Sequence, residues 1–512
     1  MFISIRNSLF LSLLAGTLAC GAQNNSDYAA SSATNRRAMA ADHSSMMGAP
    51  ASMSESGDTY ESDQENQVTS AADQSTSTFS IDVDTASYAN ARRFLRQGHL
   101  PPANSIRVEE FINYFRYAYA GPENDRPFAV HSEVASSPWT PGHKLLKIGI
   151  QGKRLDNSAL PKRNLVFLLD VSGSMSASDK LPLLKQGFRM LSNTLGEDDR
   201  VSIVVYAGAA GAVLLPTSGA DKHTIMEALD NLQGGGGTNG GQGIELAYKL
   251  AEQNFDPDAV NRIILASDGD FNVGMTNKNE LVKLIERKRK SGVYLSVLGF
   301  GRGNLNDATM EQLADKGNGN YSYIDSVSEA KKVLVEEGAS TLITIAKDVK
   351  IQVEFDTEMV ENYRLIGYEN RVMANEDFDN DAADAGELGP GHSVSALYEF
   401  LPKEGANGKS IAELRLRYKL PNGEQSYLLT QDIGEENESS AGASTEMRFA
   451  SAVAGFALLL KHSEFSGQLG WDRVEAMASD ALGENPSKYR KELLELIRVA
   501  RGLSQSTSEL AQ

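Results

Sequence analysis

The chain has few of the residues on which several classes of protein depend. Of its 512 residues, one is cysteine and seven are histidine. A mature chain with a single thiol cannot form an internal disulfide, so a disulfide-stabilised secreted fold is excluded. The histidines show no metal-ligand spacing, and no serine, histidine and aspartate set stands on a nucleophile elbow. Neither a histidine-based metal site nor a serine hydrolase is indicated.

Positive charge is also scarce. The chain has 49 Lys and Arg against 68 Asp and Glu, a formal net charge of -19. Binding to nucleic acid depends on a basic patch that displaces counterions from phosphates, and the sequence shows none. The one cationic cluster, residues 287–290, ends a predicted helix that begins near Asn279, where the helix dipole favours cations. No nucleic-acid partner is expected.

The hydrophobic runs of the sequence are either short or interrupted by charged residues. The apolar residues 8–18 follow the positive Arg6 and are too few to span a bilayer, which is typical of a targeting segment over residues 1–20. A second apolar run, 445–463, contains Arg448 and Lys461, which leave too short a span for a membrane helix. The sequence therefore predicts an exported protein without a transmembrane helix.

The targeting segment ends at Cys20, the only cysteine. Residues 1–20 resemble a bacterial lipoprotein signal, although Thr17 stands where such signals usually carry leucine. The resemblance implies that Cys20 is lipidated and that the protein is anchored in the bacterial cell envelope. By the same resemblance, the lack of aspartate after Cys20 implies that the protein is anchored in the outer membrane or at the cell surface. An ordinary cleaved signal ending at Ala19 or Ala22 is the alternative, and it would leave the protein secreted or periplasmic.

Residues 21–78 are rich in Ser, Ala, Asn, Asp, Gln and Met and poor in aliphatic residues. Such a segment cannot bury enough apolar surface to offset its chain entropy. We expect a disordered tether with a typical reach of roughly 40 Å.

The rest of the chain is organised around residues 164–175, NLVFLLDVSGSM. Six consecutive apolar or amide residues predict a strand buried on both faces of a parallel sheet. The strand ends on Asp170, and Ser172 and Ser174 follow with a glycine between them, where the chain turns. A carboxylate and two hydroxyls supply half of the oxygen shell that a hard divalent cation requires.

Two further segments are expected to complete this shell. Thr238 lies in the glycine-rich loop 234–241, and Asp268 follows a second apolar strand, 262–267. Ligands of open parallel sheets collect at the carboxyl ends of strands, where both aspartates are predicted to lie. Two carboxylates that close together would repel each other, and a cation would reverse the repulsion.

This Asp-x-Ser-x-Ser, Thr, Asp set resembles the metal-ion-dependent adhesion site of the von Willebrand factor A domain. The resemblance implies that Ser172, Ser174 and Thr238 bind Mg²⁺ directly and that Asp170 and Asp268 act largely through water, with Ca²⁺ or Mn²⁺ as possible substitutes. It also implies one open coordination position, which accepts an Asp or Glu carboxylate from a protein partner.

Strand and helix patterns around this set predict the domain organisation. The α/β alternation of residues 161–346 predicts a doubly wound, mostly parallel sheet. Alternating runs in 121–160 and 347–435 predict an antiparallel β-sandwich into which this domain is inserted. Helical patterns follow over 445–505.

Residues 79–120 predict a helical lead-in and resemble the segment preceding the A domain in a group of bacterial lipoproteins. Thr85 is expected to cap a helix through Phe94, and 107–117 to form a second helix. The aromatic residues of that second helix are expected to pack against the main domain.

These patterns predict a surface-anchored, non-enzymatic protein that binds a protein partner through Mg²⁺, in adhesion or in assembly of an envelope complex. Two other functional hypotheses remain open. A metal-dependent hydrolase would need a base beside the cation, for which Asp270 is the nearby candidate. A structural scaffold would bind its partners equally well without metal.

Overall fold

The computed structural model describes residues 57–61, 64–156, 160–269, 278–405, 410–434 and 442–510. The chain divides into two compact units, and all of these residues belong to the second. Three expectations fall outside the described residues: lipidation of Cys20, disorder of residues 21–56, and the role of Asp270.

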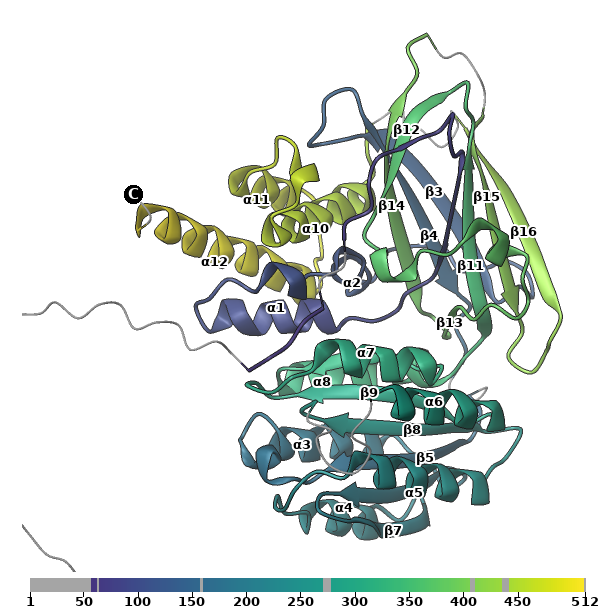
Figure 1. Ribbon diagram of the computed structural model, residues 1–512, viewed down its shortest axis with the longest axis vertical. Coiled ribbons are helices and arrows are strands. Elements are labelled where there is room, and N and C mark those ends of the chain that lie inside the picture. The colour runs from purple at the N-terminus through teal and green to yellow at the C-terminus, as the bar shows by residue number, and fades with distance from the viewer. Residues whose placement is uncertain are drawn as a thin grey trace, which may run out of the picture. The chain divides into compact units, whose positions relative to one another are not determined.

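A six-stranded sheet with the order β10-β9-β8-β5-β6-β7 forms the α/β domain (Figure 1). Every neighbouring pair is parallel except β6 and β7, so the sheet is mostly parallel, as predicted. The central strand β5 is buried on both faces from Asn164 to Asp170, which is why its sequence does not alternate. The strands are β5 (Arg163–Asp170), β6 (Arg200–Tyr206), β7 (Ala210–Ser218), β8 (Val260–Ser267), β9 (Tyr294–Phe300) and β10 (Tyr321–Ile324).

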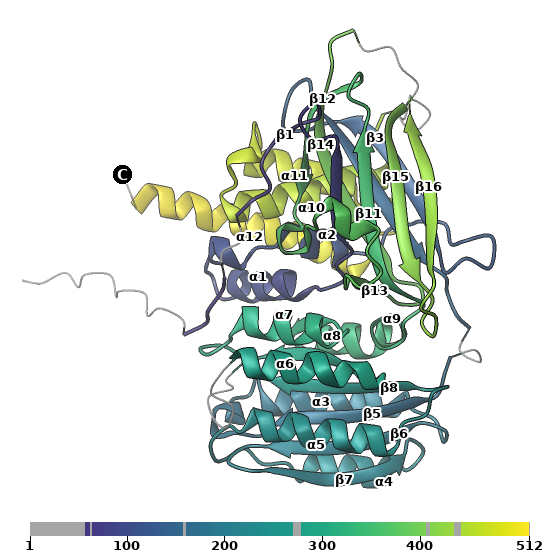
Figure 2. The same ribbon diagram turned by 45° about the vertical axis from the view of Figure 1, so that its right-hand side comes forward.

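Helices cover both faces of this sheet (Figure 2). Val166 and Leu168 point to a core shared with α5, α6 and α7, and the alternate residues Leu165 and Phe167 point to a core shared with α3, α4 and α8. This period-two separation places one set of helices on each side of the sheet. The helices are α3 (Leu181–Asn193), α4 (Lys222–Asp230), α5 (Gly240–Gln253), α6 (Lys278–Lys288), α7 (Asp307–Lys316) and α8 (Val327–Lys331).

The surrounding strands form two antiparallel sheets, β1-β12-β14-β4-β3 and β13-β11-β15-β16, with β2 beside β11. The α/β domain enters the chain between β4 and β11, which confirms the predicted insertion into a β-sandwich. The strands are β1 (Thr69–Ser70), β2 (Thr76–Ser80), β3 (Phe128–Ser136), β4 (Lys144–Gly152), β11 (Ala346–Phe355), β12 (Val360–Ile366), β13 (Gly386–Leu388), β14 (Ser393–Pro402), β15 (Ser410–Lys419) and β16 (Ser426–Gly434).

Residues 57–61 and 64–78 of the expected tether belong to the folded structure, so the predicted boundary at residue 78 is wrong. From Gly57 onward the chain is bonded to the folded protein: β1 pairs with β12 and β2 pairs with β11. Backbone pairing and polar side chains, such as Asn66 bonded to the Leu365 carbonyl, hold it there. The prediction of disorder rested on the low content of apolar residues, so it missed a segment that hydrogen bonds hold in place.

The lead-in also differs from its prediction. Its helices are α1 (Ala86–Arg96) and the short α2 (Val108–Asn113), and the Thr85 side chain makes no capping hydrogen bond. Of the aromatic residues of the second segment, Tyr114 reaches the α/β domain, where its hydroxyl donates to Glu329 on α8 over 2.7 Å, but the two phenylalanines do not pack there as predicted. Phe111 meets Phe456 with ring centroids 6.0 Å apart, and Phe115 meets Phe449 at 5.1 Å, so they pack against the C-terminal helices.

The C-terminal region is helical, as predicted, and consists of α10 (Thr445–Lys461), α11 (Trp471–Asp480) and α12 (Lys488–Leu510). The apolar face of α10, including Val453 and Phe456, belongs to the same buried core as the lead-in. Among the helices of the described residues, none has the length and apolarity needed to cross a bilayer.

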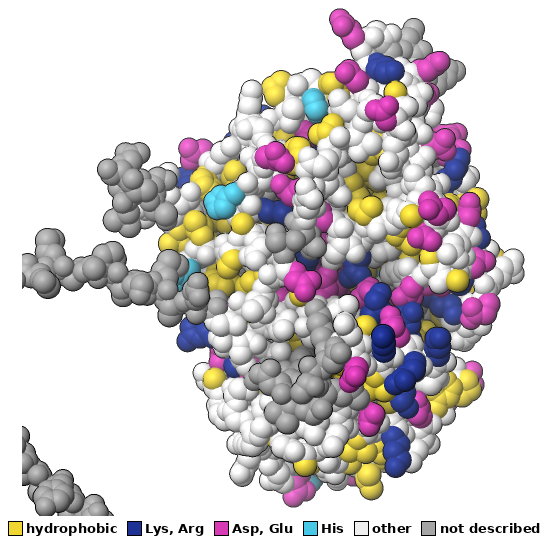
Figure 3. Space-filling model, in the orientation of Figure 1, with side chains coloured by type: hydrophobic (Ala, Val, Ile, Leu, Met, Phe, Trp, Pro, Cys, Tyr) yellow, Lys and Arg dark blue, Asp and Glu magenta, His cyan; other side chains and the backbone are white. Residues whose placement is uncertain are grey.

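Lys and Arg side chains gather on the surface in the region of α6, at the lower right of Figure 3. Lys283, Arg287 and Lys290 are exposed there. Arg287 lies in the last turn of α6 and Lys290 just beyond it, where the helix dipole favours cations, as the sequence predicts.

Candidate metal centre

The carboxyl ends of β5 and β8 bring the two predicted aspartates to one edge of the sheet. Leu169 on β5 pairs with Ala266 on β8, so Asp170 lies beside Ser267 and Asp268 follows directly. The Ser267 hydroxyl donates to Asp170 Oδ2 over 3.0 Å. Both aspartates are fully buried.

The serine turn after β5 places its hydroxyls together. The Ser172 amide donates to Asp170 Oδ1 over 2.9 Å, and the Ser172 and Ser174 Oγ atoms lie 2.9 Å apart. Ser172 is buried and Ser174 is exposed. The hydroxyl pair therefore runs from the buried carboxylate to the surface.

The glycine loop that carries Thr238 is bonded to the same turn. The Gly173 amide donates to the Gly236 carbonyl over 3.1 Å, and the Gly235 amide donates to the Val171 carbonyl over 2.8 Å. Gly236 has φ +81°, a conformation that favours glycine. Thr238 itself is buried and lies two residues before α5 begins.

The electrostatics of Asp170 favour a cation. Burial raises its pKa to about 6, hydrogen bonds from Ser172 and Ser267 oppose the rise, and the nearby Asp268 adds to it. Its two hydrogen-bond donors are neutral groups. A buried charge with neutral partners is costly, and a divalent ion at this edge would offset that cost.

Lys180 also contributes to this edge, and sequence reasoning missed it. Its ammonium donates to Asp268 Oδ2 over 2.9 Å and to Asn304 Oδ1 over 2.8 Å. Lys180 is the N-cap residue of α3. A cation at a helix N-terminus opposes the helix dipole, and this unfavourable position was the available signal.

The donor set fits a hard divalent cation. Carboxylate and hydroxyl oxygens are the ligands that Mg²⁺ and Ca²⁺ prefer, and the outward Ser174 leaves a side from which a ligand can approach. Within the described ranges, no group of three or more His, Cys, Asp and Glu side chains could hold a metal. The two carboxylates with their hydroxyls are thus the candidate site.

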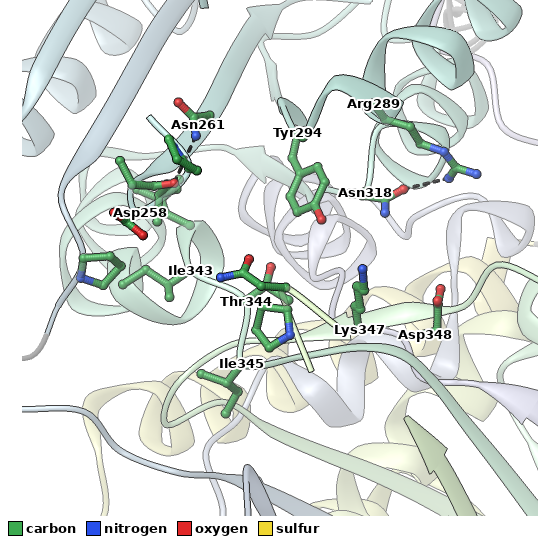
Figure 4. A pocket seen from close by; sticks show the side chains of 18 of the residues that line it. Asp258, Asn261, Arg289, Tyr294, Asn318, Ile343, Thr344, Ile345, Lys347 and Asp348 are labelled. Atoms are coloured by element: carbon green, nitrogen blue, oxygen red, sulfur yellow. Dashed lines mark hydrogen bonds between the residues drawn. The ribbon is translucent and has the colours of Figure 1, made fainter. Parts of the chain in front are cut away.

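A cavity of about 920 Å³ lies at the opposite edge of the sheet. Figure 4 shows Asn261 and Tyr294 reaching it from the starts of β8 and β9, with Thr344 and Lys347 on the other side. Two of its lining cations have side-chain partners: Arg289 binds Asn318 and Asp384, and Lys347 pairs with Glu424.

Comparison with known proteins shows to which family this chain belongs. An uncharacterized protein of Escherichia coli (strain K12), YfbK, is 41% identical over 470 residues, which cover 87% of this chain and 81% of that relative. The chain belongs to the YfbK family of von Willebrand factor type A proteins. Three family models match the chain: von Willebrand factor at 54–147, von Willebrand factor type A domain at 164–336, and YfbK C-terminal at 340–409 and 402–503.

More distant relatives share only part of the chain. A protein of Synechocystis is 30% identical over 185 residues, 36% of this chain and 43% of that protein. Human inter-alpha-trypsin inhibitor heavy chain H4 is 29% identical over 226 residues, 41% of this chain and 23% of that protein. A solved von Willebrand factor type A structure from Catenulispora acidiphila is 16% identical, with a TM-score of 0.45, and covers 75% of this chain and 91% of that one.

Domains of the von Willebrand factor type A family generally mediate protein–protein interactions. In this YfbK-family chain, residues 164–336 match the von Willebrand factor type A domain and include all five residues of the candidate site.

Proposed function

We propose that this YfbK-family protein is an envelope-anchored, non-enzymatic binding protein that recognises a protein partner through Mg²⁺. The observation that carries the proposal is the meeting of the serine turn, the Thr238 loop and the end of β8 at one edge of the sheet. Adhesion and assembly of an envelope complex are both roles that such a site can serve.

Each residue of the site has a distinct task in this proposal. Ser172, Ser174 and Thr238 offer hydroxyl oxygens to the metal, while the buried Asp170 and Asp268 supply negative charge, largely through water. The bound metal would supply an electron-poor position open to an incoming anion. An Asp or Glu carboxylate of the partner fills that position.

Anchoring would come from lipidation of Cys20, which would place the protein in the bacterial envelope, at the outer membrane or cell surface. Between Cys20 and the first bonded segment at Gly57 lie residues 21–56.

Direct cation binding tests the first half of the proposal. Isothermal titration of the full chain with Mg²⁺ or Mn²⁺ should show one site, and Ser174→Ala should weaken it at least tenfold because a direct ligand is lost. Ser176→Ala is the matched control, since its hydroxyl bonds the Gly173 carbonyl in the same turn and lies outside the proposed shell.

Partner capture from cell envelopes tests the second half. A partner held through the metal should be recovered in Mg²⁺ by the wild type and by Ser176→Ala, and lost in EDTA or with Ser174→Ala. Capture that is unchanged in EDTA would instead indicate a metal-independent scaffold. Metal-dependent cleavage of the captured partner would indicate a hydrolase.

A further inference from the structure

The Lys180 ammonium occupies a fixed position beside the candidate metal. It bonds Asp268 Oδ2 at 2.9 Å and Asn304 Oδ1 at 2.8 Å, and its side chain is 7% exposed. Lysine side chains usually extend into water, and a buried ammonium requires specific partners. Its partners here are a predicted metal-site carboxylate and an amide oxygen.

The loop after β9 holds the lysine in place. Gly301 has φ +71°, and a Cβ added there would lie 2.3 Å from Cγ and Cε of Lys180, so only glycine leaves room for the lysine stem. Asp58 in turn fixes this loop, because its Oδ1 accepts from the Gly303 amide at 2.7 Å and the Leu305 amide at 3.0 Å. The ammonium is therefore positioned by several segments.

We propose that Lys180 acts as a built-in second cation of the metal site and makes it selective for anionic partners. This inference rests on the proposed function. Two carboxylates cancel the charge of Mg²⁺, and the fixed ammonium leaves a net charge of about +1 at the site. Lys180 thus weakens binding of the metal and strengthens binding of a carboxylate in the open position. It is a positioning residue, since it acts through Asp268.

Removing the charge while keeping the stem tests this role. In Lys180→Met, a unit positive charge is lost beside the proposed metal site, and at an effective dielectric of about 20 this should tighten Mn²⁺ binding about tenfold or more. Acetate, as the carboxylate probe, should bind the Mn²⁺-loaded variant several-fold more weakly. Titration calorimetry measures Mn²⁺, and water-proton relaxation measures the displacement of metal-bound water by acetate.

Asn304→Asp is a second variant that keeps Lys180 and its packing. The new carboxylate would pair with the ammonium and cancel its charge, so it should shift both affinities in the same directions as Lys180→Met. Lys180→Arg retains the charge and should stay close to wild type. Lys185→Met is the matched control: it removes the same charge from the same helix, where Lys185 bonds the carbonyls of Asp230 and Leu232.

Each outcome decides the proposal. Tighter Mn²⁺ binding and weaker acetate binding in Lys180→Met and Asn304→Asp, with both affinities unchanged in Lys185→Met, support the proposal. Mn²⁺ binding by Lys180→Met alone, with none by the wild type, means that the ammonium takes the place of the metal, which overturns both the second-cation role and the Mg²⁺ function. Unchanged or weaker Mn²⁺ binding in both variants, beside a wild type that binds, overturns only the inference. Absence of binding in every form overturns both.

Discussion

The Asp170 carboxylate lies fully buried at the end of β5, with the Ser172 amide and the Ser267 hydroxyl as its donors. Its pKa is raised from 3.8 to about 6, so the folded metal-free protein binds this proton more tightly than the unfolded chain. The resulting contribution to stability is fully present below pH 3.8 and is lost as the pH rises through about 6. Above that pH the ionised group opposes folding until a cation compensates it.

Asp170→Asn should therefore stabilise the metal-free protein at alkaline pH while abolishing metal binding. The rise in pKa corresponds to about 3 kcal/mol, and the gain should grow from near zero at about pH 4 toward that value at about pH 8. Urea unfolding in EDTA across this range measures it. A gain that does not depend on pH would show that ionisation of Asp170 is not the cause.

At this scale strand ends and the serine turn mark four of the five oxygen-bearing residues locally in the sequence, the glycine-rich loop marks Thr238, and their role as a metal shell stays a prediction. Lys180 could not be placed in the same way. Its partners lie 88 and 124 positions away, and only the fold brings them to it: Asp268 from the end of β8 and Asn304 from the loop between β9 and α7. A side chain that reaches a site across the sheet leaves no spacing pattern in the sequence.

At the scale of structural elements, residues Gly57 to Tyr60 are hydrogen-bonded along the loop after β9, and we call this segment the strap. The Thr59 amide donates to the Leu305 carbonyl over 2.8 Å, and the Thr59 carbonyl accepts from the Asp307 amide over 3.2 Å. The fully buried Asp58 side chain adds an ion pair of 2.9 Å with Arg93 on α1. The strap thus joins the first described residues and helix α1 to the loop that holds Lys180.

Asp58→Ala should destabilise the protein by about 3–5 kcal/mol, because it leaves the buried Arg93 charge without this partner and two loop amides unbonded. Amide hydrogen exchange should accelerate at Gly303 and Leu305 before global unfolding. Asp221→Ala is the control: it removes an aspartate that caps α4 at the surface and should cost about 0.5–2 kcal/mol without affecting this loop. Equal exchange at the loop in both variants would contradict the strap.

The sequence predicted the regular elements better than this strap. Buried apolar runs such as β5 and amphipathic helices such as α5 carry their pattern in consecutive residues. The strap has no such pattern, since backbone hydrogen bonds and one aspartate hold it. The helix α2 is also shorter than predicted, because its aromatic continuation turns toward the C-terminal helices, whose position the local sequence does not encode.

Across the whole described fold, buried ion pairs join the α/β domain to the parts around it. Arg107 of the lead-in pairs with Asp307 on α7 at 2.6 Å. Arg371, which follows β12 of the sandwich, pairs with Asp84 at 3.2 Å and also contacts Asp315 on α7. Burial, and then its neighbour Asp82, raise the pKa of Asp84, and Arg371 opposes that rise. Only two chain connections join the inserted domain to the sandwich. These ion pairs therefore add to the coupling between the two.

Arg371→Ala should break that coupling. Removing one partner of a buried cluster leaves unpaired carboxylates and should cost about 3–5 kcal/mol. Since Asp315 belongs to the α/β domain and Asp84 to the lead-in, the variant should unfold in two calorimetric transitions, whereas the wild type unfolds in one. Arg189→Ala is the matched control, because its pair with Asp230 lies on the surface within the α/β domain and should contribute at most about 1 kcal/mol. A single transition in Arg371→Ala, shifted no further than in Arg189→Ala, would show that other contacts, such as the Arg107 pair, hold the domain alone.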